Sequence, residues 1–228
     1  MPLGSREYVA ELIGAFALVF YGSMSVTVFA QVLALNSPAG GLLGIALAHG
    51  LILMVMVYAI GPISGCHINP AVTVAVMAQR KIGVTDGIAY IIFQSLGAGF
   101  AGLLHSFILP GARQYGFGGV FPTLTIGGSD LTATLIEAVL TFFLVLVIFQ
   151  VAVSREASPG VSGVAIGMTL TAGILIGGPL TGGALNPVRA LGPAIASGFF
   201  DHQWVYWVGP ILGGLVASYV FAYLQRKE

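Results

Sequence analysis

The chain has 228 residues, of which 57% are hydrophobic and only 7% are charged. An average soluble domain carries about 25% charged residues, so this composition excludes a water-facing surface over most of the chain. Lys plus Arg equals Asp plus Glu at eight each, which gives no bias toward nucleic acid or an acidic partner. The composition predicts a protein that lies mostly in the lipid bilayer.

Six apolar runs are long enough to cross the hydrocarbon core, which takes about 20 helical residues. In chain order they are Tyr8 to Val32, Gly41 to Ile60, Asp86 to Leu109, Leu131 to Val153, Val161 to Gly177 and Gln203 to Leu224. No cleavable signal pattern precedes the first run. The four His residues form no metal motif, and the single Cys66 can form no internal disulfide. We expect an all-α membrane protein with no metal site and no cofactor.

Two further apolar segments, Asn69 to Ala78 and Asn186 to Ser197, are too short to cross the bilayer. Ten helical residues rise about 15 Å against a hydrocarbon core of about 30 Å, so each segment reaches only halfway. The first opens with Asn69-Pro70-Ala71 and the second with Asn186-Pro187-Val188. Asn is a favoured N-cap, and Pro is favoured at the next position. We therefore predict two re-entrant half-helices.

The surroundings of the two short segments indicate an internal duplication. Residues 64–71 align with residues 181–188, and Glu11 in AELIGAFALVF aligns with Glu137 in IEAVLTFFLVL. The whole chain is predicted to be one channel domain, with repeats at about 6–109 and 131–226. Each repeat holds three spans, an odd number, so the second repeat must enter the membrane from the opposite side.

The basic residues of the loops indicate the orientation. With the N-terminus inside the cell, only Arg113 falls in an outer loop. The remaining loop and terminal basic residues fall inside, and these are Arg6, Arg80, Lys81, Arg155, Arg226 and Lys227. Because basic loops stay cytoplasmic, we expect both termini in the cytoplasm and the protein in a cell (inner or plasma) membrane.

The extended runs before the half-helices point to a pore, because non-helical backbone at membrane depth must be buried or line water. The residues concerned are Gly65, Cys66, His67 and Ile68 in the first repeat, and Gly182, Gly183, Ala184 and Leu185 in the second. Each Asn oxygen can cap its helix, which leaves the NH₂ group as a donor facing the cavity. Two half-helix dipoles would repel cations at the midplane, and the free carbonyls would accept hydrogen bonds from a file of water.

SGCHINPAV and GGALNPVRALGP resemble the aquaporin, or major intrinsic protein, family, and the resemblance extends from Glu7 to the last span. It implies six tilted helices with two re-entrant half-helices, an inverted repeat, and a homotetramer with one pore per subunit. It also implies a passive channel that conducts water and other small neutral solutes and excludes protons and ions. The second motif ends in Val188 instead of Ala, a change that we expect to adjust packing more than selectivity.

The same resemblance assigns an outer selectivity filter to His49, Ile174, Gly183 and Arg189. Most water channels of the family are similar in having an aromatic residue on span two and a histidine on span five. Ile174 and Gly183 predict a wider and less polar constriction. The set resembles the filter of plant vacuolar aquaporins that pass ammonia, although residues 110–130 lack the loop histidine of those relatives. Ammonia permeation is therefore left open.

Glycerol facilitators, another branch of the family, carry an Asp after the filter arginine and a Trp on span two. Ala190 and His49 stand at those positions, which disfavours linear polyols. Glu11 and Glu137 are expected to accept hydrogen bonds from the extended runs and support them. His67 either lines the inner pore or makes a structural hydrogen bond, while His105 carries no motif and is expected to be packed or solvated.

Secondary transporters and intramembrane enzymes are the two alternative classes of membrane protein. A secondary transporter also uses inverted repeats and broken helices, but it needs a coupling site, and Glu11 and Glu137 are the only acidic candidates. An intramembrane enzyme would need a nucleophile or metal motif, and the chain contains no Gly-x-Ser-x-Gly and no His-Glu-x-x-His. The sequence favours a channel over both.

Overall fold

The computed structural model describes residues 3–29, 38–120, 128–154, 157 and 159–226. Those residues form helices and no strand. In chain order the helices are α1 (Ser5–Thr27), α2 (Pro38–Ser64), α3 (Pro70–Ala78), α4 (Val84–Ile108), the 3₁₀ segment η2 (Pro110–Gly118), α5 (Asp130–Ile148), the π turn η3 (Phe149–Val153), α6 (Pro159–Thr181), α7 (Pro187–Ser197) and α8 (Val205–Leu224). Six of the described helices are long and apolar enough to cross a membrane, so the predicted fold class is confirmed.

Among the boundaries that the structure describes, the largest differences from the predicted ones are at the ends of α1, α2 and α6; α1 ends at Thr27, before the predicted Val32. Helices α2 and α6 continue four residues past their predicted ends, to Ser64 and Thr181. The Gly-Pro pairs there favour a helix end, yet Pro62 and Pro179 lie inside the last turns. A proline removes a single backbone donor. The residue that follows each helix still donates its N–H to the fourth residue back, at 2.9 and 3.1 Å, so the turn closes.

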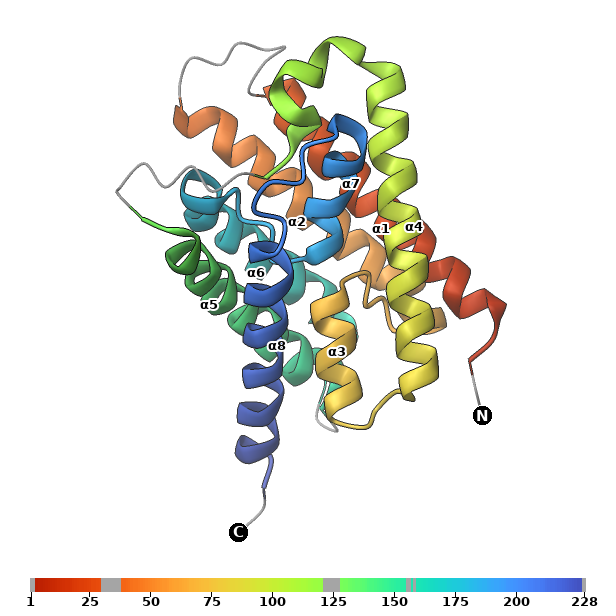
Figure 1. Cartoon of the computed structure of the whole chain (residues 1–228). Coiled ribbons are helices and arrows are strands. Elements are labelled where there is room, and N and C mark those ends of the chain that lie inside the picture. Colours follow the sequence, from red (N-terminus) through yellow and green to blue (C-terminus); the bar gives the residue numbers. More distant parts are fainter. Residues whose placement is uncertain (1–2, 30–37, 121–127, 155–156, 158, 227–228) are drawn as a thin grey trace.

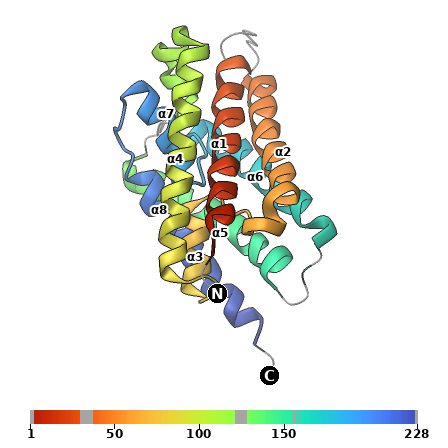
Figure 2. The same cartoon turned by 90° about the vertical axis from the view of Figure 1, so that its right-hand side faces the viewer.

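Each half-helix packs against a span of the other repeat, α3 on α8 and α7 on α4 (Figures 1 and 2). Within the repeats α1 pairs with α4 and α5 pairs with α8, while α2 and α6 pair across the repeats. Gly97 lies directly against the carbonyl of Leu12, and Gly213 lies in the same way against the carbonyl of Ala138. Glycine lets helix backbones approach this closely. The fold therefore repeats its helix crossings as well as its half-helices.

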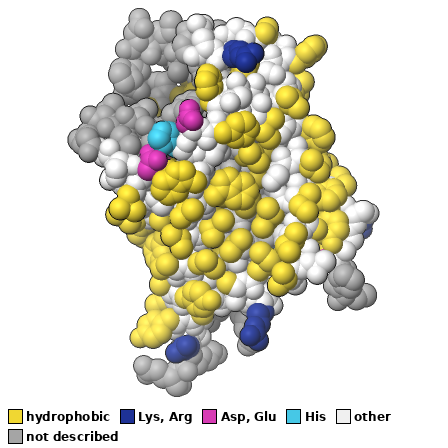
Figure 3. Space-filling view, in the orientation of Figure 1, with side chains coloured by type: hydrophobic (Ala, Val, Ile, Leu, Met, Phe, Trp, Pro, Cys, Tyr) yellow, Lys and Arg dark blue, Asp and Glu magenta, His cyan; other side chains and the backbone are white. Residues whose placement is uncertain are grey.

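The outer surface fits a lipid environment. Hydrophobic side chains cover the middle of the face shown in Figure 3, with basic side chains toward its upper and lower margins. Many exposed side chains are large and apolar, among them Phe107, Leu131 and Leu135. Both termini lie at the same end of the bundle (Figure 1), as an even number of spans requires. Val32 of the first predicted span, and Arg155 and Lys227 of the orientation prediction, lie outside the described residues.

Candidate functional site

Both half-helices begin at an asparagine cap. Oδ1 of Asn69 accepts from the N–H of Ala71 at 2.9 Å, and Oδ1 of Asn186 accepts from the N–H of Val188 at 3.0 Å. The two caps have nearly identical extended backbones, with φ of −156° in each. Pro follows each cap at the first helical position, where its missing N–H costs no hydrogen bond. The cap residues predicted from the sequence are those that the structure shows.

The side-chain amides of the two asparagines join the two repeats. Nδ2 of Asn69 donates to the carbonyl of Leu185, and Nδ2 of Asn186 donates to the carbonyl of Ile68, both at 2.9 Å. The sequence predicted that the whole NH₂ group faces the cavity. An amide nitrogen carries two N–H groups, and one of them is used in this contact, so a single N–H remains from each asparagine. The half-helices are therefore held tip to tip.

In the first repeat Glu11 holds the extended run from α1. Its Oε1 accepts from Ser64 Oγ at 2.7 Å and from the N–H of His67 at 2.9 Å. Its Oε2 accepts from the N–H of Ile68 at 2.6 Å. The Tyr90 hydroxyl donates to the carbonyl of Ser64 at 2.8 Å. A buried carboxylate is tolerated when hydrogen bonds surround it, and here the donors are the backbone groups of the run.

In the second repeat Glu137 on α5 does the same. Its Oε1 accepts from Thr181 Oγ1 at 2.6 Å and from the N–H of Ala184 at 3.0 Å. Its Oε2 accepts from the N–H of Leu185 at 2.8 Å. The Tyr206 hydroxyl donates to the carbonyl of Thr181 at 2.6 Å. Corresponding hydrogen bonds therefore fix the two extended runs, with one glutamate and one tyrosine in each repeat.

A polar network that the sequence did not indicate surrounds the first run, and the described residues show no counterpart around the second. Gln94 Nε2 donates to Glu11 Oε2 at 2.7 Å and to Thr73 Oγ1 at 3.0 Å. The Thr73 hydroxyl donates to the carbonyl of Asn69 at 3.1 Å, so its oxygen accepts at the 3.2 Å contact with His67 Nδ1. Nδ1 must then carry the proton, which leaves Nε2 of His67 as an acceptor. His67 makes this bond and also lines the cavity.

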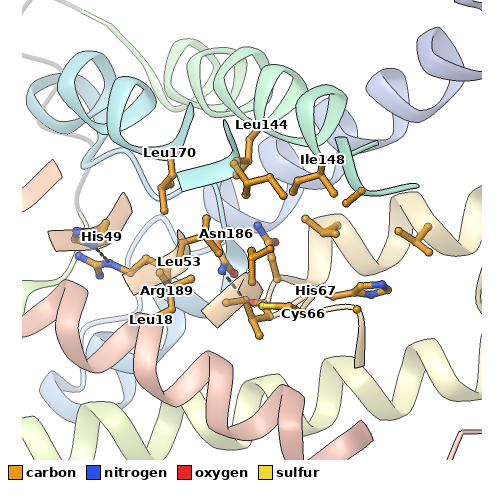
Figure 4. Close-up of a pocket in the computed structure, with 18 of the residues that line it drawn as sticks. Leu18, His49, Leu53, Cys66, His67, Leu144, Ile148, Leu170, Asn186 and Arg189 are labelled. Carbon is orange, nitrogen blue, oxygen red and sulfur yellow. Dashed lines mark hydrogen bonds between the residues drawn. The ribbon is translucent and has the colours of Figure 1, made fainter. Parts of the chain in front are cut away.

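A cavity of about 130 Å³ lies along the two half-helix tips. Figure 4 shows His49 and Arg189 at one end, Asn186 in the middle and His67 toward the other end. Apolar side chains of α2, α5 and α6 also line the cavity, among them Leu53, Leu144, Ile148, Ile166 and Leu170. A few polar groups in a mostly apolar lining can fix the orientation of a small polar molecule.

Arg189 and His49 meet at the outer end of this cavity. Arg189 Nε donates to His49 Nε2 at 2.9 Å, and His49 Nδ1 donates to the carbonyl of Ile45 at 2.8 Å. Because one ring nitrogen donates and the other accepts, the imidazole is neutral in this arrangement. Arg189 Nη2 donates to the carbonyl of Gly118 at 3.0 Å, while Nη1 has no hydrogen-bond partner within the described residues.

The structure places the other two filter residues next to each other, away from the cavity wall. A Cβ on Gly183 would lie 3.4 Å from the Cα of Ile174, which is 2% exposed. Neither residue is among those that line the cavity. Sequence patterns gave no signal for Gly118, or for Gly22, whose Cα faces the His49 ring with no room for a Cβ. Only a tertiary contact shows that these two glycines belong to the filter region.

Comparisons with known proteins agree with this geometry. The family model described as major intrinsic protein matches residues 2–221. Aquaporin NIP1-1 of Zea mays is 37% identical over 220 residues, which cover 95% of this chain and 73% of the relative. Probable aquaporin TIP2-1 of Oryza sativa subsp. japonica is 40% identical over 222 residues, which cover 95% and 86%. An aquaglyceroporin structure from Plasmodium falciparum superposes with a TM-score of 0.82 at 25% identity, over 95% of this chain and 94% of that one.

Proposed function

The chain belongs to the major intrinsic protein family, a family of membrane channels for water and small solutes, and from this premise we propose how its own residues select what passes. The selective groups are Arg189, His49 and the two capping asparagines. The repeats that build them span about 6–109 and 131–226, and the whole chain is a single channel domain.

The observation that carries the proposal is the junction of the two half-helix tips at one cavity. Asn69 and Asn186 are each 4% exposed or less and bond to the opposite repeat, so the tips cannot separate without losing both bonds. Each tip adds the positive end of a helix dipole to the junction. One remaining amide N–H from each asparagine can donate to a water oxygen, and the carbonyls of the extended runs can accept from it.

Ion exclusion follows from the charge at the outer end. Arg189 lines the cavity and brings a fixed positive charge to this end. An arginine together with half-helix dipoles is the known arrangement by which aquaporin-type pores exclude protons and cations. His49 is neutral in its hydrogen-bonded state and adds no second charge. The pore therefore passes neutral molecules down their gradients.

The solute range is wider than water alone and includes ammonia. The support is the resemblance of the filter set His49, Ile174, Gly183 and Arg189 to that of the vacuolar aquaporins that pass ammonia. Ile174 is apolar, and Gly183 has no side chain. Much of the cavity lining is apolar and so offers few donors, which suits ammonia because it accepts through a single lone pair where water has two.

Stopped-flow light scattering on proteoliposomes tests these assignments. Wild type should raise water permeability over empty vesicles, with a flux that rises linearly with the gradient and needs no coupling ion. Ile174→His tests whether Ile174 bounds the constriction, because a polar ring placed there should suppress ammonia and spare water. Equal suppression of all solutes would remove the filter assignment, and saturable or ion-dependent flux would favour a carrier.

Three further assignments complete the proposal. The protein forms a homotetramer with one pore in each subunit, to be checked by native mass spectrometry in detergent. Both termini are cytoplasmic, and the host membrane is a cell (inner or plasma) membrane. The support for this orientation is the position of Arg80 and Lys81 after α3, at the end of the bundle that also carries both termini (Figure 1). Protease access to a C-terminal tag in inside-out vesicles checks it.

A further inference from the structure

The backbone that leads to Gly118 is held in an unfavourable conformation. Gly116, Phe117 and Gly118 have φ of 62°, 51° and 68°. The left-handed region is open to glycine but disfavoured for phenylalanine. Such a residue persists only where its surroundings hold it in place. Phe117 is 3% exposed, so its ring is enclosed on nearly every side.

A buried histidine that the pore does not use forms part of this enclosure. His105 on α4 is fully buried, and its ring meets the Phe117 ring edge-on with centroids 5.6 Å apart. His105 Nδ1 lies 3.1 Å from Ser23 Oγ, and Nε2 lies 3.1 Å from Thr27 Oγ1. Both hydroxyls belong to α1. His105 therefore joins α4 to α1 and presents a fixed ring face to Phe117.

Gly118 contacts the same turn of α1. Its Cα faces the backbone carbonyl of Ser23 so closely that no Cβ could fit. On its other side the Gly118 carbonyl accepts from Arg189 Nη2 at 3.0 Å. A continuous set of contacts thus runs from His105 through Phe117 and Gly118 to the filter cation. His105 itself does not line the cavity and touches no solute.

We propose that His105 is a positioning residue for the selectivity filter, which acts through Phe117 and the Gly118 carbonyl to hold the Arg189 guanidinium against the wall. The inference rests on the proposed channel function. Without the His105 contact, Phe117 can relax toward negative φ, and the Gly118 carbonyl turns away from Nη2. The guanidinium is then held only by its Nε bond to His49. It can rotate into the passage and narrow it.

The primary test compares three purified variants in proteoliposomes. His105→Leu keeps an apolar ring-sized volume but loses both hydrogen bonds to α1, and His105→Gln can restore one donor and one acceptor. Ser106→Ala, on the same turn of α4, is the matched control because its hydroxyl only bonds the carbonyl of Leu103. We expect the Leu variant to lower water flux per channel by about threefold, the scale of one ordinary intramolecular hydrogen bond. Flux of formamide, a wider neutral solute, should fall further.

A double-mutant cycle separates positioning from general damage to the fold. In an Arg189→Val background the guanidinium is absent, so His105→Leu should have no additional effect on the formamide-to-water ratio. Gly118→Ala perturbs the same carbonyl from the α1 side and should reproduce the phenotype of His105→Leu. This second variant serves if the Leu variant does not fold.

The outcomes are distinct. Wild-type flux equal to that of empty vesicles would end the proposed channel function itself. If wild type conducts water but His105→Leu leaves both fluxes per channel unchanged, the positioning role is overturned. It is also overturned if the effect of His105→Leu persists undiminished in the Arg189→Val background. Recovery in His105→Gln, together with loss of the effect in that background, supports the role.

Discussion

The two repeats support their extended runs with the same hydrogen bonds, but the residues around the two runs differ. Glu11 and Glu137 each accept a hydroxyl and two successive backbone N–H groups, at distances that differ by no more than 0.2 Å between the repeats. Around the first run, Gln94 and Thr73 complete a polar network. In the part of the chain that the structure describes, the second run has no such network, and Pro210 stands at the position that corresponds to Gln94.

The second repeat instead contributes a residue of the proposed selectivity filter. Arg189 occupies the position that corresponds to Val72, and it reaches His49 and Gly118. The duplication therefore preserved what the backbone needs, which is a carboxylate beneath each run. The fixed cation is therefore supplied by the second repeat alone, because the corresponding position of the first repeat, which also lines the cavity, is the apolar Val72. Three predictions test this division between shared support and unequal function.

The largest effect is expected from Glu137→Gln. The new NH₂ group would face the N–H of Leu185, two donors with no acceptor between them, at a cost of about 3 kcal/mol in the free energy of unfolding. Glu11→Gln should cost about 1 kcal/mol less, because Gln94 can turn and offer Oε1, which has no hydrogen-bond partner in the described structure. Reversible unfolding in mixed micelles measures both. Equal losses would show that Gln94 does not compensate.

A smaller maximum loss of stability is expected at the corresponding positions Cys66 and Gly183. Both have positive φ, 51° and 58°. Gly183→Ala adds left-handed strain, and its Cβ would lie 3.0 Å from the N atom of Gly178, so we expect a loss of about 2 kcal/mol. Cys66→Gly relieves the left-handed strain but raises the conformational entropy of the unfolded chain. The free energy of unfolding should therefore change by no more than about 0.5 kcal/mol.

Thermal midpoints of the two purified variants in the same detergent provide the measurement for that pair. Gly160→Ala is a suitable control, because no atom lies within 4 Å of the Cβ it would add. A larger loss from Cys66→Gly than from Gly183→Ala would contradict the correspondence between the two left-handed positions.

The third prediction concerns Gln94→Leu, which makes the surroundings of the first run resemble those of the second. Loss of the bonds to Glu11 and Thr73 should cost about 1 kcal/mol. The variant is most informative when it is combined with Glu11→Gln. In the Gln94→Leu background, Glu11→Gln should lower the free energy of unfolding as much as Glu137→Gln does in the wild type. Additive behaviour of the two changes would contradict a direct coupling between Gln94 and Glu11.

Much of the fold could be predicted because lipid imposes simple requirements. Apolar length indicated the six spans, and two short segments indicated half-helices. The ends of α2 and α6 were missed because Pro62 and Pro179 favour helix termination in sequence, whereas the neighbouring backbone bonds close the last turn. The caps at Asn69 and Asn186 were found because a local pattern, Asn before Pro, specifies them.

The sequence by itself determined which residues repeat, where each half-helix begins and which arginine lies among apolar neighbours. The tertiary structure decided the rest. It set the exchange of amide bonds between Asn69 and Asn186, the seat of Arg189 on the Gly118 carbonyl and the packing of Gly22 on His49. The physical reason is the distance along the sequence over which each interaction acts. Hydropathy and caps act within one helix, whereas every residue has a backbone carbonyl, so residue type does not show which carbonyl accepts a long-range hydrogen bond.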